Sequence, residues 1–460
     1  MFTEKDLAQI RSLGISLEEI ERQVNIFRNG IDFVRLVKPA TAGDGIESLQ
    51  QSDIEELIHL FEQNKNSYSI IRFVPASGAA SRMFKTLFEA MEVARKEGDR
   101  VLKSRRDLMD FFENLNEYPF FPDLEIAALE NGYNLNELVA SGQYSKILEL
   151  ILNSNGLNYG ALPKGLLKFH SYPGGNRTAF EEHYEETSLY LYDNDRNIHL
   201  HFTVSPEHLP LFSKLSELLN AKYSEEKGLK YEVQFSVQKP ATDTLAVDSE
   251  NQPFRLEDGS LLFRPGGHGA LIDNLGDLKE SIVFIGNIDN VSPDHTKEFR
   301  VRYKKFLGGF LIRKMEEVFS ILDRVDMGDY GEELRKEALA VIKNLSPGAA
   351  TELANESSPG DFILKLRSYL NRPMRVCGMV RNSGEPGGGP FWVMDSKGRV
   401  SKQIIESSQI NLEDPEQKKI FHGSTHFNPV DLVCCISDHR GNNFDLNRFI
   451  DPEMAFIAHK

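Results

Sequence analysis

The segment from Ile70 to Phe84 constrains the fold of this chain more than any other stretch. It begins with Ile-Ile-Arg-Phe-Val, whose apolar and β-branched residues predict a buried strand. Small residues follow from Ala76 to Ala80, and we expect a helix to open with Ser81 and Arg82. A strand that leads through small residues into a helix N-terminus is typical of phosphate sites, because backbone N–H groups and the helix dipole attract anions. An ordinary strand–turn–helix connection is the alternative interpretation.

Four residues of this segment are candidate phosphate ligands. Ala76, Ser77 and Gly78 have side chains too small to block the backbone, so their N–H groups can approach a phosphate closely. Arg82 adds a permanent positive charge, and the planar fork of its guanidinium matches phosphate oxygens. The segment therefore predicts an anion site at the end of its strand.

The composition is that of an ordinary globular protein. The chain has 460 residues, 40% of them hydrophobic and 27% charged, which suits a large catalytic domain with additions. Its net charge of −16 argues against binding to nucleic acid or to an anionic membrane, and no apolar stretch is long enough to span a bilayer. Cys377, Cys434 and Cys435 are odd in number and lack metal-ligand spacing, and the charged start lacks an apolar signal core. We therefore expect a reduced, cytoplasmic protein.

Hydrophobic periodicity divides the chain into four parts. Helical spacing dominates residues 1–68, 80–160 and 304–370. Between residues 160 and 300, short apolar runs alternate with helical patterns, which predicts an α/β domain with a mostly parallel sheet. The expected parts are an N-terminal helical segment at 1–68, an α/β core at 69–303, a helical insertion at 304–370 and a C-terminal part of the core at 371–460. The chain ends at Lys460 directly after the strand-like residues 454–458, so we expect further residues beyond it.

Two later segments carry polar candidates. Lys164 stands between Pro163 and Gly165, so a turn would hold its ammonium where it can meet a phosphate; an ordinary surface lysine is the alternative. Gln238 follows a predicted strand, and its amide offers both a donor and an acceptor to the edge of a nucleobase. A surface amide is the alternative there.

A glycine-dense loop and a strand-end aspartate come next. Gly266, Gly267 and Gly269 are costly in chain entropy, which indicates that a ligand approaches the backbone closely, with a tight turn as the alternative. Asp289 ends an apolar strand and offers oxygens to a hard cation such as Mg²⁺. The asparagines beside it, at 287 and 290, could equally form turns.

Three acidic residues near the C-terminus complete the candidates. Glu385 and Glu406 can hold sugar hydroxyls, because carboxylates accept strong charge-assisted hydrogen bonds. Asp431 is a candidate second ligand of the metal ion. We interpret His268 and His426 as loop residues that hydrogen-bond or touch a ligand, rather than as catalytic bases.

The order of these segments resembles a known family. A small-residue loop ending in Ser-Arg-Met, then Pro-Lys-x-Leu-Leu, a Gln–Pro segment, a glycine-rich loop and Asn-x-Asp-Asn is similar to the sugar-phosphate nucleotidyltransferases. The Gly-His-Gly loop and Asn287–Asn290 look closest to the UDP-sugar pyrophosphorylase branch. The whole chain also resembles a bacterial family catalogued as a domain of unknown function. One departure is Ala79-Ala80, where the nucleotidyltransferases usually have another glycine and often threonine.

The resemblance implies a Rossmann-like, GT-A-type fold: a mixed, mostly parallel sheet with helices on both faces, plus helical additions. It also implies that a nucleoside triphosphate and a sugar 1-phosphate react to give a nucleotide sugar and pyrophosphate by Mg²⁺-assisted in-line attack. The loop around Gly78 and Arg82 would hold the triphosphate, and Lys164 would neutralise the attacked phosphate or the sugar phosphate. The remaining implied roles are base and ribose binding by Gln238, Gly266, Gly267 and Gly269, Mg²⁺ binding by Asp289, and sugar binding by Glu385 and Glu406.

Two other functions are compatible with the same residues. A glycosyltransferase on a related fold would use Asp289 and its metal ion to hold a nucleotide sugar. A non-catalytic nucleotide-sugar-binding protein would keep the fold without turnover. The absence of a Gly-x-x-x-x-Gly-Lys-Ser/Thr pattern argues against a P-loop kinase.

Overall fold

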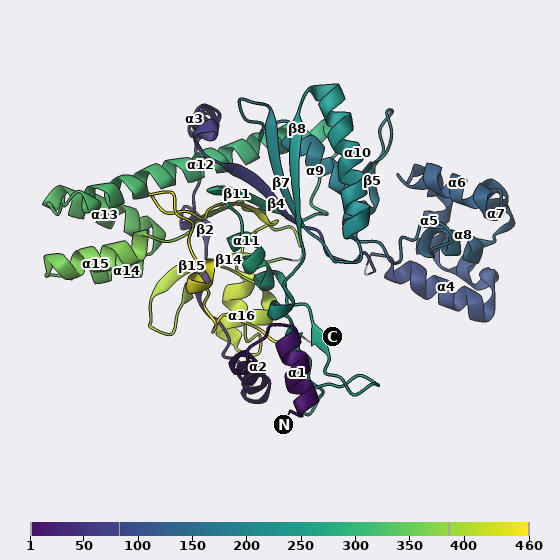
Figure 1. The fold of residues 1–460 in the computed structure, drawn as a ribbon, viewed down its shortest axis with the longest axis horizontal. Helices are drawn as coiled ribbons and strands as arrows, with labels where there is room; N and C mark the ends of the chain where they lie inside the picture. The colour runs from purple at the N-terminus through teal and green to yellow at the C-terminus, as the bar shows by residue number, and fades with distance from the viewer. Residues whose placement is uncertain (1, 82, 385–386, 459–460) are drawn as a thin grey trace. The chain divides into compact units, whose positions relative to one another are not determined.

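The computed structural model describes residues 2–81, 83–384 and 387–458, and its secondary structure is drawn in Figure 1. The chain divides into two compact units, each built from separate stretches of sequence. The first unit comprises residues 1–73, 238–286 and 302–460, and the second comprises residues 74–237 and 287–301. Each unit is described by itself.

The first unit contains a mixed sheet. Strand β4 (Ile70–Pro75) begins there and runs parallel to β11 (Ile282–Gly286), with Ile71 opposite Val283. On the other side of β11, two strands pair in antiparallel fashion. Strand β17 (Asp431–Cys435) pairs with β11, and β12 (Met374–Cys377) pairs with β17. The first five residues of β4 are buried, as expected for a strand covered on both sides.

Helices cover both faces of this sheet. On one face Phe73 and Val283 pack with Leu271 and Leu278, which flank helix α11 (Ile272–Gly276). On the other face Phe284 meets Phe61 of helix α3 (Gln51–Asn64), with ring centroids 5.9 Å apart. A Cβ atom at Gly308 of helix α12 (Asp294–Asp326) would lie 2.6 Å from the ring of Phe61, so only glycine lets these helices approach so closely. The expected α/β architecture with helices on both faces is confirmed.

A second, three-stranded sheet of the first unit was not expected. Strand β1 (Arg35–Pro39) pairs antiparallel with β14 (Gly389–Met394), which pairs with β15 (Val400–Ile405). Helical periodicity predicted helices throughout residues 1–68, and this is wrong at β1, because its partner strand is distant in sequence. The helices of that stretch are α1 (Glu4–Ser12), α2 (Leu17–Asn29) and α3.

The helical stretch expected at 304–370 is confirmed, although it begins earlier. Helix α12 already starts at Asp294 and runs to Asp326. It is followed by α13 (Glu332–Leu345), α14 (Pro347–Ala354) and α15 (Pro359–Leu370), whose apolar residues share one core with the end of α12 (Figure 1). Residues 454–458 were expected to form a strand, and they belong to neither a strand nor a helix.

The second unit contains a parallel β–α–β arrangement. Strands β7 (Asn197–Thr203) and β8 (Lys230–Ser236) are parallel along their whole lengths, and helix α10 (Leu209–Lys227) connects them. The buried aromatic rings of Phe180 and of Phe202, a residue of β7, pack against each other with centroids 4.5 Å apart. The expected strands at these positions are confirmed.

The second unit also holds a group of helices with a core of its own (Figure 1). The helix predicted to open at Ser81 begins only at Lys85, because Ser81, Met83 and Phe84 lie in a turn. The two ends of this helical group lie next to each other, because the N–H of Ala80 donates to the carbonyl of Leu162 at 3.4 Å. The helices are α4 (Lys85–Glu97), α5 (Arg106–Glu113), α6 (Phe121–Glu130), α7 (Leu135–Ser141) and α8 (Tyr144–Leu152).

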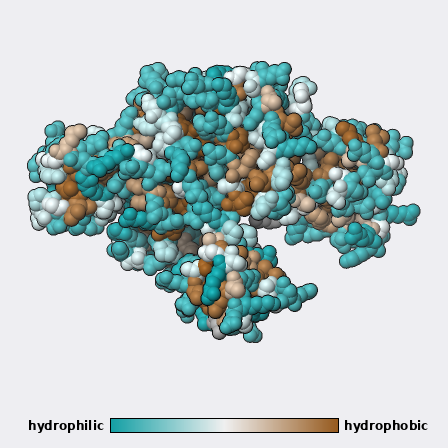
Figure 2. Space-filling view, in the orientation of Figure 1, coloured by the Kyte–Doolittle hydropathy of each residue, from teal (hydrophilic) through white to brown (hydrophobic). Residues whose placement is uncertain are grey.

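The face drawn in Figure 2 is mostly hydrophilic, with hydrophobic residues among the polar ones. Within the described part of the chain, none of the helices combines the length and apolarity needed to cross a membrane.

Candidate functional site

The loop after β4 and the segment around Lys164 lie side by side in the second unit. The N–H of Lys164 donates to the carbonyl of Gly78 at 3.2 Å, and Ala79 forms an isolated antiparallel β-bridge with Pro163. Ala76 is buried and its N–H donates to Thr203 at 2.8 Å, so it is not available to a ligand. Ser77 and Gly78 are exposed, and among the described residues nothing accepts a hydrogen bond from their N–H groups. Arg82 lies outside the described residues.

Lys164 and Asp289, which the sequence analysis placed in separate roles, form an ion pair. Lys164 Nζ lies 2.5 Å from Asp289 Oδ2, and the side chains are 28% and 35% exposed. Lys164 opens a short 3-10 turn after Pro163, and Asp289 follows the end of β11. The structure therefore joins the small-residue loop, the lysine and the aspartate into one partly exposed cluster, which we call the Lys164 site.

Close packing and hydrogen bonds hold the backbone on either side of this ion pair. A Cβ atom at Gly165 would lie 2.9 Å from the ring of Phe212 and 3.1 Å from Ile288, so the turn needs glycine at this position. The buried ring of His183 donates through Nε2 to the carbonyl of Ile288 at 3.2 Å. On the other side of Asp289, Arg300 donates to Asn290 Oδ1 at 3.1 Å.

Helix α9 (Ala179–Thr187) packs against the turn that begins at Lys164. The sequence analysis assigned no role to the residues of this helix. Its first N–H, that of Ala179, donates to Leu167 at 3.1 Å. Glu182 is fully buried, and its carboxylate accepts from Lys297 Nζ at 2.5 Å and from the Tyr172 hydroxyl at 2.7 Å. A buried carboxylate is stable only with such partners. The run Arg177–Glu182 in the sequence marks the start of this helix, but its glutamates gave no sign of being buried.

The charges around Glu182 shift neighbouring pKa values. Burial, helped by the adjacent carboxylate of Glu182, raises the pKa of the Tyr172 hydroxyl, which therefore stays a hydrogen-bond donor. Burial raises the pKa of Asp294, but hydrogen bonds from Arg177 and Lys297 outweigh it, and the net pKa lies below its usual value. Asp294 therefore stays ionised at neutral pH at the start of α12.

In the first unit, the structure brings together Gln238 and Gly266. A Cβ atom at Gly266 would lie 2.9 Å from the Thr242 carbonyl and 3.8 Å from Gln238 Nε2. Gln238 donates to Thr242 Oγ1 at 3.3 Å and to Asp243 Oδ1 at 3.4 Å, and burial raises the pKa of Asp243. The backbone at Gly267 and Gly269 is exposed, and an added Cβ atom would meet open space at both positions.

The remaining candidates of the first unit have structural partners. Glu406 is exposed and stands at the start of the short helix η7 (Ser407–Gln409), where its backbone N–H donates to Gln409 Oε1 at 3.0 Å. Asp431 stands opposite Gly286 in the sheet, and its carboxylate is paired with the buried ammonium of Lys304. Thr425 Oγ1 and His426 Nδ1 lie 2.8 Å apart. Glu385 and the side chain of His268 lie outside the described structure.

The donor set at Asp289 fits a magnesium ion that also binds phosphate. Within the described residues, no three acidic, histidine or cysteine side chains gather as a metal site. Mg²⁺, however, is commonly held by one or two carboxylates together with substrate phosphates and water. The ammonium of Lys164 against Asp289 marks a position where this carboxylate attracts a cation.

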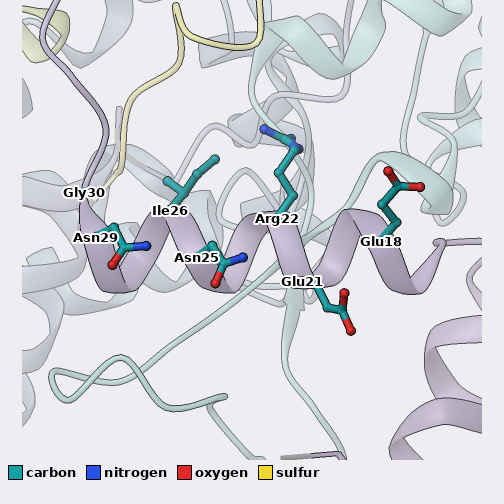
Figure 3. A pocket seen from close by; sticks show the side chains of 7 residues that line it. All are labelled: Glu18, Glu21, Arg22, Asn25, Ile26, Asn29 and Gly30. Carbon is teal, nitrogen blue, oxygen red and sulfur yellow. The ribbon is translucent and has the colours of Figure 1, made fainter.

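A pocket on α2 is separate from these candidates (Figure 3). Its side chains come from one helix and project in different directions, and Arg22 is already paired with Glu19 at 2.8 Å. No function is assigned to it. The residues that line it are Glu18, Glu21, Arg22, Asn25, Ile26, Asn29 and Gly30.

The protein therefore has a mixed α/β fold, and its Lys164 site is a partly exposed cluster of loop residues that includes one ion pair. The chain matches the family model described as a domain of unknown function, DUF4301, over residues 3–460, and it belongs to that family. None of the curated proteins compared with it matches.

Solved structures of two enzymes are similar to the chain at low identity. UDP-N-acetylglucosamine pyrophosphorylase from Trypanosoma brucei is 13% identical with a TM-score of 0.41, and the match covers 90% of this chain and 56% of that one. Two variants of UDP-glucose pyrophosphorylase from Leishmania major are 10% and 11% identical, with TM-scores of 0.36 and 0.38. Their matches cover 94% and 95% of this chain and 62% and 64% of theirs, so the chain spans less than two thirds of each of these structures.

Proposed function

We propose that this protein transfers a nucleotidyl group from a nucleoside triphosphate to a sugar 1-phosphate, releasing pyrophosphate. The observation that carries the proposal is the Lys164–Asp289 ion pair beside the exposed backbone of Ser77 and Gly78. A cation, a carboxylate and unpaired N–H donors in one cluster are the groups that phosphate transfer requires. The motif order of the sequence supports the same reaction.

Each group of the Lys164 site has a distinct task in this reaction. The N–H groups of Ser77 and Gly78 bind phosphate oxygens, and Lys164 neutralises the negative charge that develops on the attacked phosphate. Asp289 holds Mg²⁺, which when bound supplies charge neutralisation to the phosphates. No protein nucleophile is needed, because positioning the sugar phosphate in line with the attacked phosphorus is sufficient.

The substrate assignments rest on the sequence. Gln238 and Gly266, which lie together, would contact the base and ribose, with the exposed backbone of Gly267 and Gly269 beside them. Glu385 and Glu406 would contact the sugar, and Arg82 would contact the triphosphate. The pairing of Asp431 with the buried ammonium of Lys304 argues against the expected metal ion at Asp431. The nucleobase and the sugar are left open, and we propose a cytoplasmic location.

A pyrophosphate assay tests the proposal. The full chain is incubated with Mg²⁺, each of the common nucleoside triphosphates and a panel of sugar 1-phosphates, and pyrophosphate is measured. Release that requires both substrates is the expected result. Hydrolysis of nucleotide sugars without pyrophosphate chemistry would indicate a glycosyltransferase, and thermal stabilisation by nucleotide sugars without turnover would indicate a binding protein.

A further inference from the structure

We propose that Lys164 is an internal counter-ion, which occupies Asp289 in the free protein and leaves it for the phosphate of an arriving nucleotide. The divalent cation then takes the place of the ammonium, so the anion and the cation bind cooperatively. The identity of the anion rests on the proposed function. The competition between the ammonium and the cation rests only on the geometry of the pair.

The first step of the argument is that the two cations exclude each other. Lys164 Nζ lies 2.5 Å from Asp289 Oδ2, within hydrogen-bonding distance. A magnesium ion bonds carboxylate oxygens at about 2.0–2.1 Å. Both cations on one carboxylate would stand close together and repel each other. The ammonium must therefore move before Asp289 can bind a metal ion well.

The second step is that the lysine, and not the aspartate, is free to move. The backbone beside Asp289 is held by His183 at Ile288 and by Arg300 at Asn290. The side chain of Lys164 is 28% exposed, and Asp289 is the one partner of its ammonium among the described residues. Rotation of its four-carbon stem is enough to release the aspartate.

The third step is that the phosphate loop lies within reach of the released lysine. The N–H of Lys164 is bonded to the carbonyl of Gly78, so the stem of the lysine starts beside the exposed N–H donors of that loop. A phosphate held by these donors attracts the ammonium away from Asp289 and leaves the carboxylate uncompensated. Nucleotide binding thereby creates the cation site.

The Lys304–Asp431 pair provides a contrast. Lys304 is only 1% exposed, whereas Lys164 is 28% exposed. Releasing a buried ammonium leaves two buried charges unpaired, which is far more costly than releasing an exposed one. We therefore expect a divalent cation to replace the ammonium at the Lys164–Asp289 pair and not at the Lys304–Asp431 pair.

Binding of Mn²⁺ to the full chain without nucleotide, followed by electron paramagnetic resonance, tests the proposal. Lys164→Met frees Asp289, and we expect Mn²⁺ to bind about twofold to fivefold more tightly than to the wild type, the range that loss of a partly exposed ion pair allows. The double variant Lys164→Met/Asp289→Asn should lose this gain. Lys146→Met is the matched control, because Glu149 is 33% exposed and pairs with Lys146 at 3.2 Å in the same unit.

Three results would overturn the proposal: no tighter binding in Lys164→Met, an equal gain in Lys146→Met, or a gain that survives Asp289→Asn. Lys164→Gln replaces Lys164→Met if the latter does not fold. The measurement involves no turnover, so it can fail or succeed independently of the pyrophosphate assay, and the two proposals remain distinguishable.

Discussion

The backbone N–H of Lys164 donates to the carbonyl of Gly78 at 3.2 Å. This hydrogen bond links the two ends of the segment that contains helices α4 to α8. It also brings a cation and a loop of exposed N–H donors, which are far apart in sequence, into one cluster. The account of function given above depends on this contact and on the neighbouring Asp289.

Removing the ammonium tests the role of Lys164. We expect Lys164→Met to slow turnover by about ten- to a thousandfold, equivalent to roughly 1.4–4 kcal/mol in the barrier. Unfolding in urea should show a loss of at most about 1 kcal/mol, because the ion pair with Asp289 is exposed. Wild-type turnover in this variant would remove Lys164 from the reaction.

Gly165 tests the packing beneath the site. An alanine Cβ atom would crowd Phe212 and Ile288, so we expect Gly165→Ala to destabilise the fold by about 1–3 kcal/mol. Gly174→Ala is the matched control, because a Cβ atom there meets open space. Equal stability of the two variants in urea unfolding would contradict the packing argument.

The buried ion pair between Glu182 and Lys297 should matter more than any exposed one. Glu182→Gln leaves a buried ammonium without its main counter-ion, and we expect it to lower the free energy of unfolding by about 3–5 kcal/mol. Glu149→Gln removes one partner of an exposed pair and should cost at most about 1 kcal/mol. Similar values for the two variants would mean that Glu182 is not held as described.

Asp326 should give the protein a measurable acid sensitivity. Hydrogen bonds from His439, Arg367 and Arg440 hold the pKa of Asp326 below its ordinary value of 3.8. Because the folded-state pKa is depressed, the resulting stability is present above the unfolded pKa and is lost as the pH falls below it.

At pH 7 we therefore expect Asp326→Asn to be less stable than the wild type. The difference between them should shrink as the pH falls from about 5 to about 2. Chemical denaturation at several pH values measures this difference. A difference that does not change with pH would show that ionisation of Asp326 does not stabilise the fold.

Local signals in the sequence predicted much of the fold. The largely apolar runs at Ile70 and Ile282 form the buried strands β4 and β11, as expected for strands covered on both faces. The runs at Ile198 and Tyr231, which alternate apolar and polar residues, form β7 and β8. Strand β1 was missed, because only its pairing with the distant β14 stabilises it. Helix α4 was placed too early, since small residues at 79–81 are compatible with both a helix and the turn that forms there.

The candidate site was predicted in its residue types but not in its contacts. Lys164 and Asp289 were each singled out, and their ion pair could not be foreseen, because it depends on the tertiary fold. Helix α9 was missed for a related reason. Four glutamates in a short helix indicate an exposed surface, unless lysine and arginine partners arrive from other elements, as Lys297 does for Glu182.

Pyrophosphorolysis is the most direct test of the central claim, because it is the reverse of the proposed reaction. The full chain is incubated with Mg²⁺, pyrophosphate and a panel of nucleotide sugars, and nucleoside triphosphate is measured by chromatography. We predict triphosphate from at least one nucleotide sugar, only when pyrophosphate is present, and a strongly reduced rate in Lys164→Met. Absence of triphosphate with every nucleotide sugar, in protein shown to be folded by circular dichroism, would contradict the account.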